Sequence, residues 1–362
     1  MGVNTDSVII IHNKKEEEKM KKKFLSMVLA GAMVLAVTAC GSQGADEGSA
    51  DAQPAEQEAP AEEAEAPAEE EAEAETEASG DVKKVAFICK SYSDTFCLAV
   101  NDEFKKAAEE YSDKFTVDFF DSANEASTQN DQIETCTASD YDAIVFQQVD
   151  AEAPVEVVKA ALDKGIYVIV TTGHIEDDGA SWYVDADPYQ QGQVVVNYAV
   201  ENGFCDDAKV AILSGPIGNF HSDNRVQAFK DAVEAKDGAE LVATEVGNWS
   251  KDEALTIAQN WLVAYPDLKV ILAANDDMGL GAIEAIEMAG KEGQIKVFAV
   301  DGTEAGLEAV TDGRLEATVK QDAKGYAVEA MNILIDLLDN GSAESMNIDS
   351  ALVTKDNVEE FK

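Results

Sequence analysis

Short apolar runs and longer amphipathic stretches alternate along most of this chain. One run, VILAA at residues 270–274, stops at Asn275 and two aspartates and continues into a stretch rich in small residues. An apolar run that ends at polar residues and turns into a helix is typical of a strand buried on both faces of a parallel sheet. This part of the chain therefore predicts a buried strand followed by a helix.

The same pattern recurs through most of the chain. Apolar runs predict strands at residues 85–89, 115–120, 143–146, 167–170, 183–184, 210–213, 241–246, 270–274, 297–300 and 317–320. Amphipathic stretches predict helices at residues 96–111, 129–137, 153–163, 190–201, 223–233, 252–265, 279–288 and 326–338. Alternation on this scale predicts an α/β protein with two doubly wound parallel-sheet domains, joined by a hinge and with the ligand cleft between them.

Polar and aromatic residues follow many of the predicted strands. Ligands of doubly wound sheets bind beyond the carboxyl ends of the strands, so these residues are candidate ligand contacts. They are Asp94, Phe96, Thr172, His174, Asn219, His221, Arg225, Trp249, Asn275, Asp301 and Gln321. Lys90 has a similar place after the first strand. Carboxylates and amides can each bind two adjacent hydroxyls, arginine donates a rigid fork, and aromatic faces pack on sugar rings, so the set favours a sugar site.

Several of these residues also have a purely structural interpretation. Asn275 can simply cap the helix that follows it, because Asn and Asp are preferred N-caps. Phe96 and Trp249 can belong to the core, which is the commoner place for large aromatic side chains. Arg225 can form a structural salt bridge. The position of Trp249 at a strand end, between two polar residues, favours the site over the core.

Charge narrows the classes of partner. The chain has 362 residues with 72 acidic and 27 basic side chains, and residues 81–362 alone hold 54 acidic and 21 basic ones. Such an excess of negative charge repels nucleic acid, so we expect no nucleic-acid partner. It also keeps a protein soluble, which is the simpler explanation of its presence.

The cysteines beyond residue 80 do not suggest a metal site. Cys89, Cys97, Cys136 and Cys205 show neither CxxC nor Cys/His metal spacing, so we expect no metal. Cys89 and Cys97 flank one predicted strand-to-helix turn. A disulfide between them is one interpretation, and two buried free thiols are the favoured one.

The first 40 residues have the composition of a targeting segment. Three lysines at residues 21–23 precede an apolar run at residues 24–37, which is too short for a good membrane span. The sequence VTACG around Cys40 resembles a bacterial lipobox, in which the cysteine is lipidated and becomes the new N-terminus. An ordinary secretory peptide with an incidental cysteine is the alternative. We expect residues 1–40 to be a signal peptide with Met20 as the true start.

Residues 41–80 have a different composition again. They hold 14 Asp and Glu and no basic residue, with mostly Ala, Pro, Ser, Gly and Gln between them. Such a segment cannot bury enough apolar surface to fold, and its charges repel each other. We expect a disordered acidic linker that tethers the globular part to a lipid anchor outside the cytoplasmic membrane.

Several short stretches occur in an order that is known from one family. They are YSDTF at 92–96, QNDQI at 129–133, AND at 274–276, VDG at 300–302 and TVKQ at 318–321, together with Arg225 and Trp249. With these stretches the chain resembles bacterial periplasmic sugar-binding proteins of the galactose- and ribose-binding type. The resemblance covers nearly all of residues 81–362. It implies the type I periplasmic binding protein fold, and ligand contacts from Asp94, Phe96, Arg225, Trp249, Asn275, Asp301 and Gln321, with the two aromatic rings on either side of the sugar.

The chain departs from the family pattern on one wall of the expected cleft. After the fourth strand, the glucose/galactose type carries an amide and the ribose type an Asp-Arg pair, whereas this chain has Thr172, Gly173 and His174. Lys90 and Cys97 also differ from both patterns, so a galactose/glucose-like and a ribose-like ligand both stay open. The calcium loop of the galactose type is missing, and we expect neither a metal nor a cofactor.

The resemblance also implies how the chain is divided. The first domain is expected to comprise residues 81–186 plus 322–350, and the second residues 187–321 plus 351–362. The expected protein is a monomer, anchored to the membrane of a bacterium through Cys40, that captures a monosaccharide by closing its cleft.

Two other functions are weighed against transport. In the main hypothesis, the protein delivers its sugar to the permease of an ABC transporter with a cytoplasmic ATPase. A receptor that signals to a membrane sensor kinase is the alternative. An enzyme is not expected: Asp94 and Asp301 could form a glycosidase pair, but the chain has no nucleophile elbow, phosphate loop or HExxH motif.

Overall fold

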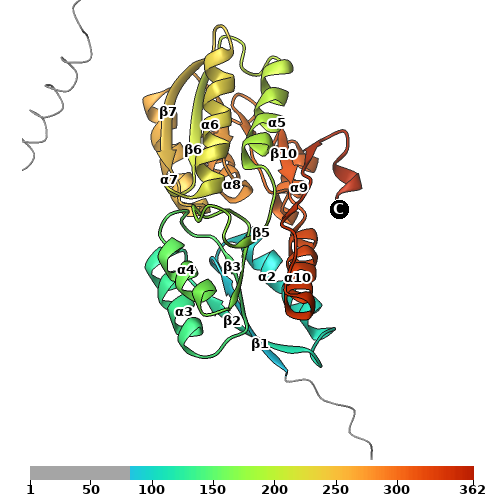
Figure 1. The fold of residues 1–362 in the computed structure, drawn as a ribbon. Coiled ribbons are helices and arrows are strands. Elements are labelled where there is room, and N and C mark those ends of the chain that lie inside the picture. Colours follow the sequence, from blue (N-terminus) through green and yellow to red (C-terminus); the bar gives the residue numbers. More distant parts are fainter. Residues whose placement is uncertain (1–81) are drawn as a thin grey trace, which may run out of the picture. The chain divides into compact units, whose positions relative to one another are not determined.

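The computed structural model of this chain describes residues 82–362, which belong to one compact unit. The predicted signal peptide, Cys40 and the acidic linker lie outside the described residues. The described part has two lobes, each built on one sheet (Figure 1).

The first sheet is parallel throughout, with the strand order β11-β5-β4-β3-β1-β2. Its strands are β1 (Lys83–Cys89), β2 (Phe115–Asp121), β3 (Ala143–Gln147), β4 (Tyr167–Thr171), β5 (Trp182–Asp185) and β11 (Met346–Asn347). One face packs on α2 (Thr95–Glu109) and α10 (Ala323–Asn340), the other on α3 (Ala126–Ala138) and α4 (Val155–Asp163). We call this part the first lobe.

The second sheet has the order β12-β10-β9-β8-β6-β7, in which only β12 is antiparallel to its neighbour. Its strands are β6 (Lys209–Ser214), β7 (Glu240–Val246), β8 (Leu268–Ala273), β9 (Lys296–Phe298), β10 (Ala317–Lys320) and β12 (Ala351–Thr354). One face packs on α5 (Pro188–Glu201) and α6 (Phe220–Ala235). The other packs on α7 (Lys251–Ala264), α8 (Asp276–Met288), α9 (Glu304–Asp312) and the 3-10 turn η1 (Val358–Glu360). We call this part the second lobe.

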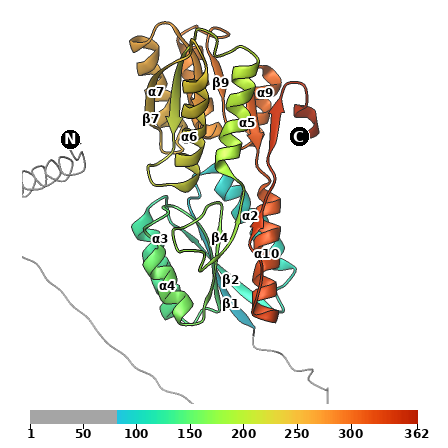
Figure 2. The same cartoon turned by 45° about the horizontal axis from the view of Figure 1, so that its top comes forward.

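The chain passes between the lobes three times. It crosses between β5 and α5, between β10 and α10, and between β11 and β12, as Figures 1 and 2 let the reader follow. Each lobe is therefore made of segments that are far apart in the sequence. The boundaries expected at residues 186/187, 321/322 and 350/351 stay a prediction.

The strands and helices expected from the hydrophobic pattern are present, with ends that differ by a few residues. Several helices begin earlier than the amphipathic pattern does, because a polar residue caps them. The side chains of Asn219, Asn275 and Asp322 each accept the backbone N–H three residues later. Four elements were not predicted: α9, β11, β12 and η1. The fold class, two doubly wound α/β sheets, is confirmed.

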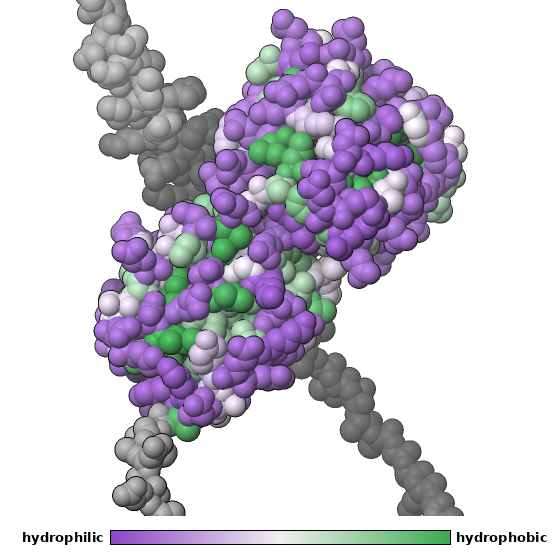
Figure 3. Space-filling view, turned by 90° about the vertical axis from the view of Figure 1, so that its right-hand side faces the viewer, coloured by the Kyte–Doolittle hydropathy of each residue, from purple (hydrophilic) through white to green (hydrophobic). Residues whose placement is uncertain are grey.

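The surface of the described part is mostly hydrophilic on the face that Figure 3 shows, where the hydrophobic residues are scattered. This agrees with the strongly acidic composition of the chain. Within residues 82–362, no helix combines the length and the apolar character that a membrane span requires.

Candidate ligand-binding site

The candidate site is a cavity between the two lobes, at the carboxyl ends of the central strands. In each sheet the strand order reverses direction beside the first strand, at β1/β3 and at β6/β8, and ligands of doubly wound sheets bind at such switch points. The lining residues are Lys90, Asp94, Phe96, Cys97, Thr172, Asn219, His221, Arg225, Trp249, Asn275, Asp301 and Gln321. All the predicted contacts except His174 are therefore brought together, and Lys90 and Cys97 join them.

The side chains leave little free space in this cavity. Its volume is about 30 Å³, which is room for a water molecule, whereas ligand pockets start at ~300 Å³. A second cavity of about 320 Å³ lies beside it and shares Asp94 and Trp249 with it. A ligand of the size of a sugar therefore enters the inner cavity only when the walls move apart.

A buried ion pair dominates the wall from the first lobe. Asp94 caps α2: its Oδ1 accepts the backbone N–H of Cys97 at 2.9 Å, while its Oδ2 lies 2.6 Å from Nζ of Lys90. Burial by itself would raise the pKa of Asp94, but the ammonium and the N–H lower it below its ordinary value. Burial would likewise lower the pKa of Lys90, and the Asp94 carboxylate more than offsets this. Both groups are charged.

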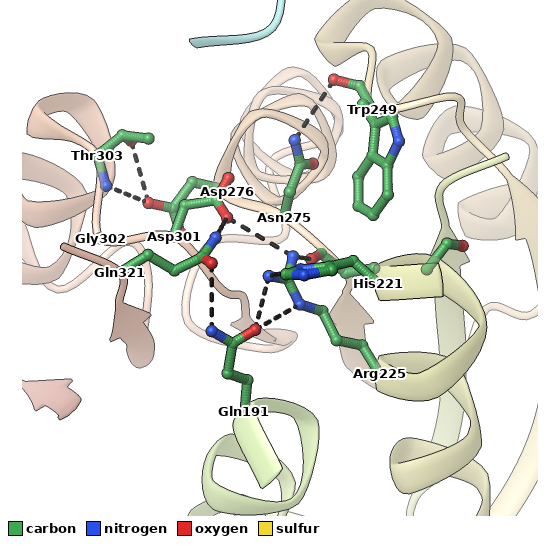
Figure 4. A network of polar contacts seen from close by, with 12 residues as sticks. Gln191, His221, Arg225, Trp249, Asn275, Asp276, Asp301, Gly302, Thr303 and Gln321 are labelled. Carbon is green, nitrogen blue, oxygen red and sulfur yellow. Dashed lines mark hydrogen bonds and ion pairs between the residues drawn. The ribbon is translucent and has the colours of Figure 1, made fainter. Parts of the chain in front are cut away.

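The guanidinium of Arg225 is the centre of the wall from the second lobe (Figure 4). Its Nε and Nη2 donate to Oε1 of Gln191 at 3.1 and 2.7 Å, Nη1 donates to the Ala274 carbonyl at 2.9 Å, and Nη2 also donates to Nδ1 of His221 at 2.9 Å. Oδ1 of Asp301 lies 3.6 Å from Nη1. Four of the five N–H donors of arginine thus have partners within the protein, and the fork is held rather than free.

Close packing of two helices makes this arrangement possible. Gln191 lies on α5 and Arg225 on α6, and Gly192 of α5 lies against the backbone of α6 at Arg225. A Cβ at Gly192 would lie 2.8 Å from the Arg225 carbonyl oxygen, so a larger residue would push the helices apart. Gln191 was not predicted as a site residue; the only available signal was a polar residue on the buried face of an amphipathic helix.

Asp301 and Gln321 form the next part of this wall. Nε2 of Gln321 donates to Oδ1 of Asp301 at 2.6 Å, and Asp301 has a φ of 133°, a conformation that non-glycine residues rarely adopt. Burial raises the pKa of Asp301 well above its ordinary value, and nearby Arg225 offsets this only in part. A carboxyl group of this kind can hold a proton and donate it in a hydrogen bond.

Asn275 has both of the roles that the sequence left open. Its Oδ1 accepts the backbone N–H of Met278 at 3.0 Å and so caps α8, and its Nδ2 lies 3.5 Å from the Trp249 carbonyl oxygen. It also lines the cavity. The residue that follows it, Asp276, is fully buried and accepts hydrogen bonds from Thr318 and Thr303, which ties α8 to β10 and to the start of α9.

The two aromatic residues likewise belong both to the core and to the cavity wall. Phe96 is 8% exposed and packs edge-on against Tyr326, with 5.6 Å between the ring centroids. Trp249 is 7% exposed, has a left-handed backbone with φ 63°, and its ring centroid lies 4.9 Å from Nζ of Lys90. A Cβ at Gly215 would overlap the Trp249 ring, so this glycine leaves the space that the ring fills.

Thr172 and Asn219 complete the cavity, and His174 lies outside it. The hydroxyl of Thr172 is buried and has no hydrogen-bond partner in the described part of the chain, while Nδ2 of Asn219 donates across the lobe boundary to the Val149 carbonyl at 3.1 Å. His174 stacks on Phe220, with 4.8 Å between the centroids, and its Nε2 lies 3.4 Å from Oδ2 of Asp185. Asp185 ends β5, so the strand-end rule that found the other residues would have found it too.

All four cysteines of the described part keep free thiols. Cys89, Cys97, Cys136 and Cys205 are all buried free thiols, as the favoured interpretation of the sequence had it. Burial raises the pKa of Cys89 to about 12. In residues 82–362, no group of three His, Cys, Asp or Glu side chains is placed to hold a metal ion.

Known proteins resemble this chain over most of its length. A profile of the family described as periplasmic binding protein domain matches residues 85–342. The D-ribose/D-allose-binding protein of Pseudomonas aeruginosa is 31% identical over 263 residues, which are 70% of this chain and 82% of that protein. The xylitol-binding protein of Mycolicibacterium smegmatis is 27% identical over 292 residues, or 79% of this chain and 81% of that protein.

A solved structure agrees with these relatives. The solute-binding protein of an ABC transporter from Bacillus halodurans, with bound myo-inositol, superposes with a TM-score of 0.74 at 28% identity, and the match covers 79% of this chain and 99% of that one. All three proteins are named for binding or transport rather than for catalysis. This chain therefore belongs to the periplasmic binding protein family, among the sugar-binding proteins of the type I fold.

Proposed function

We propose that this protein captures a monosaccharide or a related polyol by closing its two lobes and delivers it to the permease of an ABC importer. One observation carries the proposal. The cavity combines carboxylates, amides, an arginine and two aromatic rings, and both lobes contribute to its wall. Ribose, allose, xylitol and myo-inositol, which the relatives are named for or hold, are all uncharged polyhydroxy compounds.

The residues suit such a ligand for stated chemical reasons. The carboxyl groups of Asp94 and Asp301 and the amides of Asn275 and Gln321 can pair with adjacent hydroxyls. Phe96 and Trp249 can cover the apolar faces of a ring. Because Lys90 and Asp94 are already paired within the protein, an uncharged ligand fits the wall from the first lobe without a further ion pair.

Cleft closure follows from the division of the wall between the lobes. Contacts that need both walls exist only when the lobes are together, so a ligand that makes them shifts the equilibrium towards the closed form. We place the hinge at residues 186/187, 321/322 and 350/351. Crystal structures with and without ligand should superpose lobe by lobe and differ by a rotation at these points; a difference spread through one sheet would contradict this.

A ligand screen tests the binding proposal. Thermal unfolding of residues 81–362 should be measured with D-ribose, D-allose, D-galactose, D-glucose, xylitol and myo-inositol, with maltose as a control too large for the cavity. Ligand that binds only the native state raises the melting temperature in proportion to the logarithm of its concentration. At least one of the small compounds should do so, with saturable binding in calorimetry. No response to any of them would refute the proposal.

The importer role and the anchor need separate tests. Deletion of the gene should abolish uptake of the labelled ligand; normal uptake with loss of a transcriptional response would point to a sensor instead. We also propose that Cys40 is lipidated and holds the protein at the outer side of the cytoplasmic membrane. The change Cys40→Ser should move the protein from the membrane fraction to the medium, and retention of that variant would rule the anchor out.

A further inference from the structure

A buried histidine connects the two lobes next to the candidate site. His221 lies on α6 in the second lobe, and its Nε2 is 2.7 Å from Oδ1 of Asp185, the last residue of β5 in the first lobe. The other ring nitrogen, Nδ1, is 2.9 Å from Nη2 of Arg225. Asp185, His221 and Arg225 therefore form a continuous chain of hydrogen bonds that crosses the lobe boundary and ends at the wall of the cavity (Figure 4 labels its second-lobe members).

The partners of the ring determine its protonation. A guanidinium can only donate, so Nδ1 of His221 accepts from Arg225 and carries no proton. Nε2 then carries the single proton and donates it to Asp185. Burial lowers the pKa of His221 below its ordinary value, with Arg225 and Lys90 acting in the same direction and Asp185 against them. The ring is therefore neutral and has one fixed tautomer.

Asp185 is an unusual residue to find in this place. It is fully buried, with an exposed fraction of 0%, and a buried carboxylate is costly unless it is well paired. Its remaining contacts come from the first lobe: the Tyr326 hydroxyl donates to Oδ1 at 3.3 Å, and Nε2 of His174 lies 3.4 Å from Oδ2. Among residues 82–362, its side chain bonds to the second lobe through His221 alone.

The same network reaches the other two crossings of the chain. Gln191, which accepts from Arg225, donates to Oε1 of Gln321 at 3.2 Å and to Oγ of Ser350 at 2.9 Å. Gln321 directly precedes the crossing into α10, and Ser350 lies in the crossing between β11 and β12. Asp185 ends β5, just before the chain crosses into α5. Residues at all three connections thus bear on the orientation of one arginine.

We propose that Asp185 is a positioning residue of the candidate ligand site: across the lobe boundary it holds His221, and through it the guanidinium of Arg225, so that the site is complete only when the lobes are together. The effect of Asp185 on ligand binding rests on the proposed function, whereas its hold on His221 and Arg225 does not. When the lobes separate, the His221 ring loses its bond to the Asp185 carboxylate. Arg225 then keeps His221 on the same helix, but as a ring that is no longer held in one orientation. Asp185 thereby favours the closed form without contacting the ligand.

The structural part is tested without ligand. Histidine labelled with ¹⁵N should show an unprotonated Nδ1 and a protonated Nε2 for His221 in the wild type, with no protonation near pH 6.5, the ordinary value. In Asp185→Ala the ring should titrate close to that value, because separated lobes expose it to solvent and relieve the burial that lowers its pKa. If the lobes stayed together, loss of Asp185 would lower the pKa of the ring further. Small-angle scattering should give a larger radius of gyration for this variant. The control is Asp163→Asn, a carboxylate on the exposed surface of the same lobe, and it should match the wild type in both measurements.

The ligand part uses whichever of D-ribose, D-allose and myo-inositol stabilises the wild type most. Asp185→Ala should bind it at least ten-fold more weakly, mainly through faster dissociation, since the closed form is what it loses. Asp185→Asn keeps an oxygen that can accept from Nε2 and should recover part of the loss. If Asp185→Ala does not fold, the affinity of Asp185→Asn decides whether Asp185 strengthens ligand binding.

The outcomes separate the two proposals. If no sugar binds the wild type, the proposed function fails, and the histidine spectra still decide the role of Asp185. If sugar binds and Asp185→Ala has the affinity, dissociation rate and His221 spectrum of the wild type, the inference is overturned. If Asp185→Ala does not fold, the same result for Asp185→Asn overturns it. The charged groups that act on the pKa of His221 are Asp185, Arg225 and Lys90, and His174 and Tyr326 contact Asp185. A pH profile of ligand binding should therefore be recorded with these other residues unchanged.

Discussion

The two walls of the cleft are built in different ways. On the wall from the first lobe, Lys90 and Asp94 are four residues apart and form an ion pair across a single strand-to-helix turn. On the wall from the second lobe, Arg225 is held by Gln191, Ala274 and His221, which come from three separate segments. A local pair can form wherever its turn forms. An assembled network exists only when the sheet and helices α5 and α6 are in place, and His221 is bonded across the lobe boundary only when the lobes are together.

This difference has an energetic consequence. Removing one member of a local pair leaves one buried charge with a nearby backbone donor, whereas removing the centre of a network leaves several polar groups unpaired at once. Four changes, the first with a matched control, are given in order of decreasing expected effect, and those at Arg225 and Lys90 test this contrast directly.

Arg225→Ala should have the largest effect. It leaves Oε1 of Gln191 and Nδ1 of His221 without a donor and removes the cation next to Asp301. Breaking buried pairs of this kind costs about 3–5 kcal/mol of the free energy of unfolding. Ligand affinity should fall by at least a hundred-fold. Chemical denaturation and calorimetry measure the two quantities, and Arg225→Lys should restore only part of either because lysine lacks the fork.

The other arginine is the matched control for that change. Arg314 is exposed and makes one contact, 3.4 Å from Asp312. Surface pairs of this kind contribute about 0–1 kcal/mol, so Arg314→Ala should bind ligand as the wild type does. Equal effects at the two arginines would mean that the network on the second wall has no special role.

Asp276→Asn should change the pH dependence of stability. Burial, offset in part by bonds from Thr318 and Thr303, raises the pKa of Asp276 from 3.8 to about 6. An acid with a raised pKa stabilises the folded form below pH 3.8, and this contribution is lost as the pH rises through about 6. At about 1.4 kcal/mol per pKa unit it amounts to about 3 kcal/mol.

The asparagine variant cannot titrate, so its unfolding free energy should fall less than that of the wild type between pH 4 and 7. Denaturation curves at several pH values measure this. Parallel pH profiles for the two proteins would show that the buried carboxyl of Asp276 does not hold its proton to higher pH.

Lys90→Met should cost less than the loss of Arg225, about 1.5–3 kcal/mol, because Asp94 keeps the N–H of Cys97 and can take up a proton. In the wild type, the lowered pKa of Asp94 stabilises the folded form at pH values above the pKa of this group in the unfolded chain. This contribution is lost as the pH falls through its pKa in the folded form. Without Lys90, burial should raise the pKa of Asp94, and this loss of stability at acid pH should disappear. An NMR titration of Asp94 measures it; an unchanged pKa would mean that Lys90 is not what lowers it.

Trp249→Phe should have the smallest effect of the four. Nε1 of Trp249 is buried without a hydrogen-bond partner in the described residues, so the change removes ring area but no bond. Ligand affinity should fall by about 1 kcal/mol, roughly five-fold, while the melting temperature stays near that of the wild type. A large loss of stability with unchanged affinity would place Trp249 in the core alone.

Local rules predicted much of this molecule. Strands buried on both faces follow from short continuous apolar runs and amphipathic helices from a period of 3.6 residues, and polar residues at strand ends of a parallel sheet necessarily meet at one edge. This is why all the predicted contacts but His174 line one cavity. Helix α9 could have been found in the same way, since Thr303 caps it and Gly313, with a φ of 74°, ends it.

What the sequence alone determined was therefore the order of most strands and helices and the set of polar residues at the strand ends. The ion pair of Lys90 and Asp94 was not predicted, although it joins residues only four apart. The tertiary structure alone decided that Asp185 meets His221 and that Gln191 holds Arg225. It also decided that the short strands β11 and β12 join different sheets. The physical reason is distance along the chain: periodicity and capping act over a few residues, whereas these contacts join residues 34 or more apart and form only after two lobes have packed.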